Sequence, residues 1–92
     1  MEYVSTNYRE EELAWVSPEI TLQRDIYLMI KLKRPGKLVI RQDRGDGKKP
    51  RVPLRAHKNT SEFKLRLRVI PETIKIQIFT SSEPKEIKYA YI

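Results

Sequence analysis

The residues with catalytic potential are few. His57 is the only histidine, the chain has no cysteine, and His57 lies in the basic stretch Arg55-Ala56-His57-Lys58-Asn59. A nucleophilic triad needs a serine or cysteine, a histidine base and an orienting acid, and neither Thr60 nor Ser61 sits in a nucleophile elbow. Metal ions usually take several histidines, cysteines or carboxylates together, and neighbouring cations repel them. We therefore expect His57 to be an exposed loop residue and the chain to be a non-enzyme that holds no cofactor and no metal.

Two carboxylates, Asp43 and Asp46, are near neighbours, as the paired acids of a glycosidase would be. They lie beside Arg44 and Lys48, and the Asp46-Gly47 dipeptide predicts a turn. Their spacing does not meet the acidic pattern of an EF-hand calcium loop. We therefore interpret residues 43–51 as a loop whose excess of cations could contact phosphates or sulfates.

Charge is distributed unevenly along the chain. Residues 1–20 hold five glutamates against one arginine, a net charge of −4, so the remaining 72 residues carry +11 within a total of +7. A basic body of this kind favours anionic partners such as nucleic acid, anionic polysaccharide, an anionic membrane surface or an acidic protein. The alternative is that the lysines only keep a small β protein soluble and protect its sheet edges.

The candidate binding residues are cations on the solvent side of predicted strands or in the 43–51 loop. They are Arg41, Arg44, Lys48, Lys49, Arg51, Arg66 and Arg68. Other cations predicted on the solvent side are Lys31, Lys33, Lys64 and Lys75. Tyr27 and Phe79 share this parity, and basic residues interleaved with aromatic rings can bind single-stranded nucleic acid through phosphate contacts and base stacking. No RNP-type motif accompanies them.

The elements that must position these residues are strands, because apolar and polar residues alternate with a period of two. The alternating segments are residues 26–33, 37–42, 62–70, 73–80 and 87–92. Pro35-Gly36 predicts a type II turn, with a positive φ at the glycine, joining the first two segments into an antiparallel hairpin. Pro71-Glu72 and Ser81-Ser82-Glu83-Pro84 are predicted to separate the later strands.

Three other segments are more ambiguous. Residues 51–56 predict a short strand at a sheet edge, because Pro50 and Pro53 cannot donate hydrogen bonds to a neighbour. Residues 20–23 could extend the next strand or form one of their own. Residues 9–16 could be one or two helical turns or a strand with Leu13 and Trp15 facing inward, and we favour the strand. The final run, 87–92, is expected to pair within its own sheet, although it could add to the sheet of a neighbouring subunit.

These elements predict one domain spanning residues 1–92, an all-β fold of about seven strands. We expect a two-sheet antiparallel β-sandwich, immunoglobulin-like or fibronectin-like. The alternative is a small OB-like barrel. Residues 1–16 could be a peripheral acidic segment, with Leu13 and Trp15 covering Tyr27, Met29 and Phe79. No segment is long and apolar enough for a membrane span, and residues 1–8 show no signal peptide, which leaves the compartment open.

The leading functional hypothesis is therefore a non-enzymatic binding or structural module, part of a larger assembly or self-associating through a protein contact. The alternative is a protein that binds nucleic acid or another polyanion through a basic sheet face and the 43–51 loop. An enzyme of unfamiliar type would need a pocket with convergent polar groups.

Overall fold

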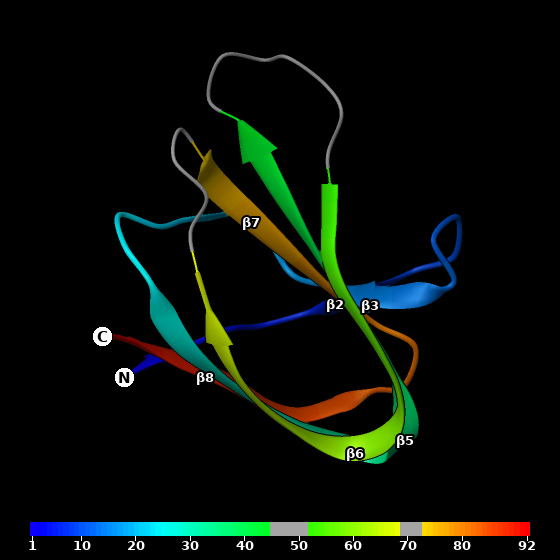
Figure 1. Ribbon diagram of the computed structural model, residues 1–92. Coiled ribbons are helices and arrows are strands. Elements are labelled where there is room, and N and C mark those ends of the chain that lie inside the picture. The colour runs from blue at the N-terminus through cyan, green and yellow to red at the C-terminus, as the bar shows by residue number, and fades with distance from the viewer. Residues whose placement is uncertain (45–51, 69–72) are drawn as a thin grey trace.

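The chain forms one antiparallel sheet of eight strands in the structure, a computed structural model that describes residues 1–44, 52–68 and 73–92 (Figure 1). The strands are β1 (Glu2–Tyr3), β2 (Asn7–Arg9), β3 (Ala14–Val16), β4 (Ile20–Thr21), β5 (Ile26–Arg44), β6 (Val52–Leu67), β7 (Thr73–Thr80) and β8 (Pro84–Tyr91). The sheet order is β1-β8-β5-β7-β3-β2, with β4 paired to β7 and β6 paired to β5. The predicted all-β antiparallel class is confirmed, and the described residues include no helix, hence none that could cross a membrane.

Strand β5 determines the shape of the sheet. Its first half pairs with β8 and its second half with β7, while β6 follows it along both halves. Because β5 and β6 both curve, the sheet curls into a half barrel (Figure 1). The strands thus belong to a single curled sheet, whereas the sequence predicted two packed sheets. The OB-like alternative is compatible with this arrangement.

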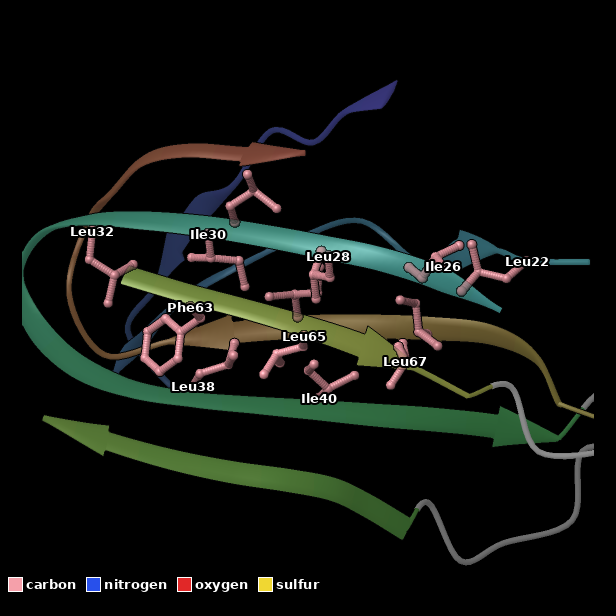
Figure 2. Close-up of a cluster of buried hydrophobic side chains, with 13 residues drawn as sticks. Leu22, Ile26, Leu28, Ile30, Leu32, Leu38, Ile40, Phe63, Leu65 and Leu67 are labelled. Atoms are coloured by element: carbon pink, nitrogen blue, oxygen red, sulfur yellow. The ribbon is translucent and has the colours of Figure 1, made fainter. Parts of the chain in front are cut away.

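The main core lies inside the curl, between the two halves of β5 (Figure 2). Its members come from β5, β6, β7 and β8 and include Leu22, the residue that directly follows β4. They are Leu22, Ile26, Leu28, Ile30, Leu32, Leu38, Ile40, Phe63, Leu65, Leu67, Ile76, Ile78 and Ile87. All except Leu22 sit on the inward parity that the alternation predicted. Burial of this much apolar surface is the main source of stability in a small domain.

The predicted hairpin at Pro35-Gly36 is wrong, because residues 26–44 form one continuous strand that bends there. The φ of Gly36 does not lie in the left-handed region. Glycine is required for another reason: a Cβ at this position would lie 2.5 Å from Oγ of Ser82 and 2.8 Å from Oγ of Ser81. The bend is therefore defined by close contact with the corner between β7 and β8, a contact made far along the chain.

Hydrogen bonds join this bend to the β7–β8 corner. The Lys37 N–H donates to Oγ of Ser81 (2.7 Å), and the Ser81 N–H donates to the Lys37 carbonyl (3.0 Å). Oγ of Ser82 donates to the Pro35 carbonyl (3.0 Å). The corner itself confirms the loop predicted between residues 81 and 84. These bonds provide partners for backbone N–H and C=O groups that the bend prevents from pairing regularly with a neighbouring strand.

Residues 9–16 contain strands, as favoured, but the inward parity was off by one. Ala14 and Val16 are buried, whereas Leu13 is 72% exposed, with a φ of 51° at the end of the β2–β3 turn. Trp15 is half-buried and packs edge-on against Tyr8. Leu13 belongs to the turn and β3 begins at Ala14, so the inward-facing positions of the strand are Ala14 and Val16. The N-terminal segment thus covers Phe79 through Ala14 and Val16, while Tyr27 remains exposed.

Ser17 connects β3 to β4 along the edge of β7. Its N–H donates to the Ile78 carbonyl (2.9 Å) and its Oγ accepts from the Ile78 N–H (2.9 Å). The hydroxyl also donates to the Pro18 carbonyl (2.9 Å). The side chain thereby supplies the acceptor that a regular strand backbone would have provided, and residues 20 and 21 resume pairing with β7 as a short strand of their own.

Residues 52–56 of the predicted 51–56 strand are part of β6, and residue 51 lies outside the described part of the chain. Among the described strands β6 pairs only with β5, so the prediction of an edge strand is confirmed for these residues. His57 also lies in β6, opposite Leu38, so its predicted place in a loop is wrong. The final run forms β8, which pairs with β5 on one side and β1 on the other. Of the predicted 43–51 loop, Asp43 and Arg44 extend β5, and residues 45–51 lie outside the described part of the chain.

Candidate binding surface

Of the seven predicted binding residues, the structure describes the side chains of Arg41, Arg66 and Arg68. Arg66 is exposed on β6, Arg68 is exposed just after it, and Arg41 lies half-buried on the second half of β5. The backbone of Arg44 pairs with Thr73 at the end of β5, and its side chain lies outside the described part. The remaining predicted residues, Lys48, Lys49 and Arg51, also fall outside it. The curl of the sheet separates Arg41 from Arg66, because the two halves of β5 present different outer faces.

Tyr27 lies directly opposite Arg66 in the strand register, on the outer face of the first half of β5. The register pairs Tyr27 with Arg66 on β6 and with Ala90 on β8. Residues directly opposite in an antiparallel pair project on the same face, about 4.5–5.5 Å apart at Cβ. Tyr27 is 52% exposed although its neighbours Ile26 and Leu28 are fully buried. An aromatic ring and a guanidinium are thus presented side by side to solvent.

The next row on this face is centred on Met29. Met29 is paired with Lys64 on β6 and Lys88 on β8, and Lys88 is paired in turn with Tyr3 on β1. Tyr3 is 70% exposed. We call six residues of these two rows the Tyr27 face: Tyr3, Tyr27, Met29, Lys64, Arg66 and Lys88. Four strands, remote from one another in the sequence, contribute to it.

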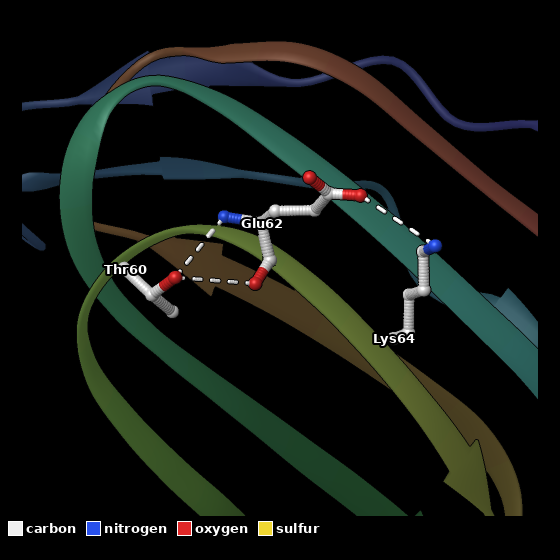
Figure 3. Close-up of polar contacts among 3 residues, drawn as sticks. All are labelled: Thr60, Glu62 and Lys64. Atoms are coloured by element: carbon white, nitrogen blue, oxygen red, sulfur yellow. Dashed lines mark hydrogen bonds and ion pairs between the residues drawn. The ribbon is translucent and has the colours of Figure 1, made fainter.

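Carboxylates border the Tyr27 face on one side. Glu62 and Glu86 are paired with Lys31 in the following row. Nζ of Lys64 lies 3.7 Å from Oε1 of Glu62, and Nζ of Lys88 lies 3.3 Å from Oε1 of Glu86. The Lys64–Glu62 pair is solvent-exposed (Figure 3), and an exposed pair of this kind contributes roughly 0–1 kcal/mol. An incoming anion could therefore compete for Lys64.

Thr60 fixes the strand that carries Glu62 and Lys64. Its Oγ1 donates to the Glu62 carbonyl (3.3 Å) and accepts from the Glu62 N–H (3.4 Å) (Figure 3). Both bonds are long, but they engage the two backbone groups of one residue where β6 curves. These bonds position Glu62 beside Lys64 on β6, at the edge of the Tyr27 face.

A shallow depression of about 170 Å³ lies over Met29. The side chains of Lys31, Lys64 and Lys88 and the two carboxylates of Glu62 and Glu86 surround it. It is open to solvent and charged at its rim, with a thioether at its floor. Such a shape suits an extended polymer that lies across strands better than a small molecule, which usually needs an enclosed and mostly apolar pocket.

Arg41 is used differently from Arg66. Its guanidinium lies over the Phe79 ring, 4.4 Å from the ring centroid, a cation–π contact on the second half of β5. Lys75, also predicted on the solvent side, pairs with Glu19 (3.6 Å). Lys33 pairs with Glu83 at the bend. These three cations do not belong to the Tyr27 face, so the charge excess alone did not identify which cations lie together.

Sequence reasoning missed Tyr3, Lys88 and the flanking carboxylates as neighbours of Tyr27. Lys88 already alternated with Ile87 and Tyr89 in the final run, so its outward parity was readable. The pairing of β8 with β5 and of β1 with β8 was not readable, because nothing local in these segments specifies their partners.

Within residues 1–44, 52–68 and 73–92, no group of three or more histidine, cysteine, aspartate or glutamate side chains could hold a metal ion. Comparison of the chain with protein-family models, with curated proteins and with solved structures found no match in any of the three. The functional proposal consequently depends on the geometry of the surface.

Proposed function

We propose that this chain is a non-enzymatic binding module, and that the Tyr27 face contacts a single-stranded nucleic acid. The observation that carries the proposal is the placement of the half-exposed Tyr27 ring directly opposite Arg66, beside Met29 with a lysine on each side. No carboxylate is paired with Tyr27.

The chemistry of a single strand matches this arrangement. Cations bind the phosphate backbone and release its counterions, while an exposed ring stacks on an unpaired base for about 1–3 kcal/mol. A duplex offers phosphates but keeps its bases stacked, so Tyr27 would gain nothing from it. Tyr3, the other exposed ring of this face, lies on the far side of Lys88 and could stack on a second base.

The fold supports the same proposal. We favour the small OB-like barrel over the immunoglobulin-like sandwich, because β5 continues without a break from one half of the sheet to the other. OB-folds bind oligonucleotides on an exposed strand face, and the Tyr27 face is such a surface. Architecture alone does not determine function, so the surface residues have to be tested.

The test is fluorescence anisotropy with labelled single-stranded DNA, single-stranded RNA, duplex DNA and heparin, each at several salt concentrations. We expect the single strands to bind most tightly. Tyr27→Ala should weaken them roughly tenfold, because loss of stacking removes about 1–3 kcal/mol, whereas Tyr27→Phe should retain most of the affinity. Arg66→Ala should reduce the slope of log K against log salt by about 0.7.

Arg34→Ala is the matched control, because it removes the same charge from an exposed position at the bend, seven residues beyond Tyr27 on β5. If Tyr27→Ala and Arg66→Ala behave like Arg34→Ala, the Tyr27 face is not the contact surface. If heparin binds more tightly than every nucleic acid, the ligand is a sulfated polysaccharide. Indifferent binding to all four polymers would contradict the polyanion proposal altogether.

A further inference from the structure

A second surface lies on the outer side of the other half of the sheet. A groove of about 200 Å³ runs between the β2–β3 turn and the second half of β5. Ala14, Val39 and Phe79 line it and belong to a small apolar cluster separate from the main core, in which Ala14 and Phe79 are buried and Val39 is partly buried. Val39 is of opposite parity to the buried Leu38 and Ile40, so this cluster lies on the outside of the curl.

Leu13 lies at the rim of this groove with most of its side chain in solvent. Its φ of 51° is in the left-handed region, which costs a residue other than glycine about 1 kcal/mol. Asparagine or glycine would fit this position of the turn better. An apolar side chain that is exposed and in a disfavoured conformation buries little surface within its own chain. Its placement therefore suggests that it is buried against a partner.

Opposite charges lie on the two sides of the groove. Glu12 lines the turn side, where Glu10 and Glu11 are also exposed, and Lys37 and Arg41 line the β5 side. The turn thus combines acids with a leucine, and the opposite side combines cations with an apolar cluster. Two adjacent surfaces that complement each other can meet across a twofold axis in an isologous contact, in which each copy gives and receives the same groups.

We propose that this groove is the interface of a twofold dimer, whose occupant is the β2–β3 turn of a second copy of this chain. Leu13 of each copy is buried against Val39 and Phe79 of the other, and Glu10 and Glu11 face Lys37 and Arg41. The net charge of +7 on each chain opposes general association, so the local charge match has to bring the copies together. The dimer leaves the Tyr27 face uncovered, so it is independent of nucleic-acid binding.

The first experiment is sedimentation velocity over a wide range of protein concentration, with the full chain. We expect the wild-type mass to rise from that of one chain to that of two, and high salt to shift this transition to higher concentration. Leu13→Asn should abolish the rise, because it keeps the turn conformation and removes the apolar contact. Ile92→Asn, which alters an exposed apolar residue at the other end of the chain, should dimerise like the wild type.

A charge exchange makes the test specific for the proposed geometry. Glu11→Lys and Lys37→Glu should each prevent dimerisation alone, since each places like charges across both halves of the twofold contact. An equal mixture of the two variants should form a heterodimer, because every contact between them is again attractive. Recovery in the mixture requires the turn of one copy to meet β5 of the other.

Three results would overturn the proposal. The first is a wild-type chain that remains monomeric at every concentration. The second is a dimer that Leu13→Asn leaves intact, and the third is a mixture of charge variants that gives no heterodimer although each variant is folded by circular dichroism. A monomeric wild type that binds an added acidic, leucine-containing peptide would assign the groove to a different protein.

Discussion

Replacing Gly36 by alanine is expected to destabilise the fold, although alanine is usually the more favourable residue within a strand. The added Cβ would lie 2.5 Å from Oγ of Ser82 and 2.8 Å from Oγ of Ser81. Neither hydroxyl is free to turn away without loss, because Ser82 donates to the Pro35 carbonyl and Ser81 accepts from the Lys37 N–H. The substitution therefore breaks or strains the two hydrogen bonds that these hydroxyls make with the bend.

The magnitude follows from these two bonds. Each contributes about 0.5–1.5 kcal/mol net, so their loss should cost about 1–3 kcal/mol. Alanine restricts the unfolded chain more than glycine does, which offsets about 0.4–1 kcal/mol. We expect Gly36→Ala to lower the free energy of unfolding by about 0.5–2 kcal/mol. For a domain of this size, 1 kcal/mol corresponds to a decrease of about 4–8 °C in Tm.

The assay is urea denaturation followed by the fluorescence of Trp15, the single tryptophan. Ser82→Ala removes the nearest of the clashing atoms, so Gly36→Ala should cost less in that background than in the wild type. The double-mutant cycle should therefore give a positive coupling between the two sites. A Gly36→Ala variant as stable as the wild type, or a cost that is unchanged in the Ser82→Ala background, would refute the close-contact explanation of this glycine.

Three further predictions concern other parts of the fold. Ser17→Ala should lower the free energy of unfolding by about 1–3 kcal/mol, because it leaves the buried Ile78 N–H without its acceptor; urea denaturation measures this, and a loss within experimental error would contradict it. At a protein concentration too low for dimerisation, Leu13→Asn should leave Tm unchanged or raise it, since asparagine tolerates the left-handed region and the leucine is 72% exposed; a clear fall in Tm at that concentration would show that Leu13 stabilises the monomer. Burial raises the pKa of Tyr89 above its usual 10.0, so the folded state favours the protonated phenol. The contribution of this phenol to the free energy of unfolding is complete below pH 10 and is lost as the pH rises through the raised pKa. Tyr89→Phe should therefore lose less stability than the wild type between about pH 9 and pH 11, and equal losses in both proteins would contradict this assignment.

The sequence predicted the inward faces of the long strands well because their determinants are local. Alternation placed Ile26, Leu28 and Ile30 on one side, and all three are fully buried. The same alternation placed Tyr27 and Arg66 outside. Each of these predictions needs only the two-residue period of the strand, which a segment carries in its own sequence.

Where the sequence misled, the determinant lay far along the chain or in one unusual dihedral. Pro35-Gly36 is a good local turn signal, but its conformation is set by Ser81 and Ser82, about 45 residues away in sequence. The parity of residues 9–16 was off by one because Leu13 adopts a left-handed conformation in the turn. The neighbours of Tyr27 on the candidate surface depended on which strands pair, and the alternation does not specify that.

Strand β5 has a consequence for how the chain folds and opens. Nearly all of β5 lies between two neighbours, with β6 on one side and β8 or β7 on the other. Its amide hydrogens should exchange with solvent only when the whole domain opens, whereas β1 and β2, at the two ends of the sheet order, can fray separately. Both halves of the curl share this one strand, so neither half can complete its core before residues near the C-terminus arrive. Folding therefore depends on pairing strands that are far apart in the sequence, which makes it slow for a chain of this length.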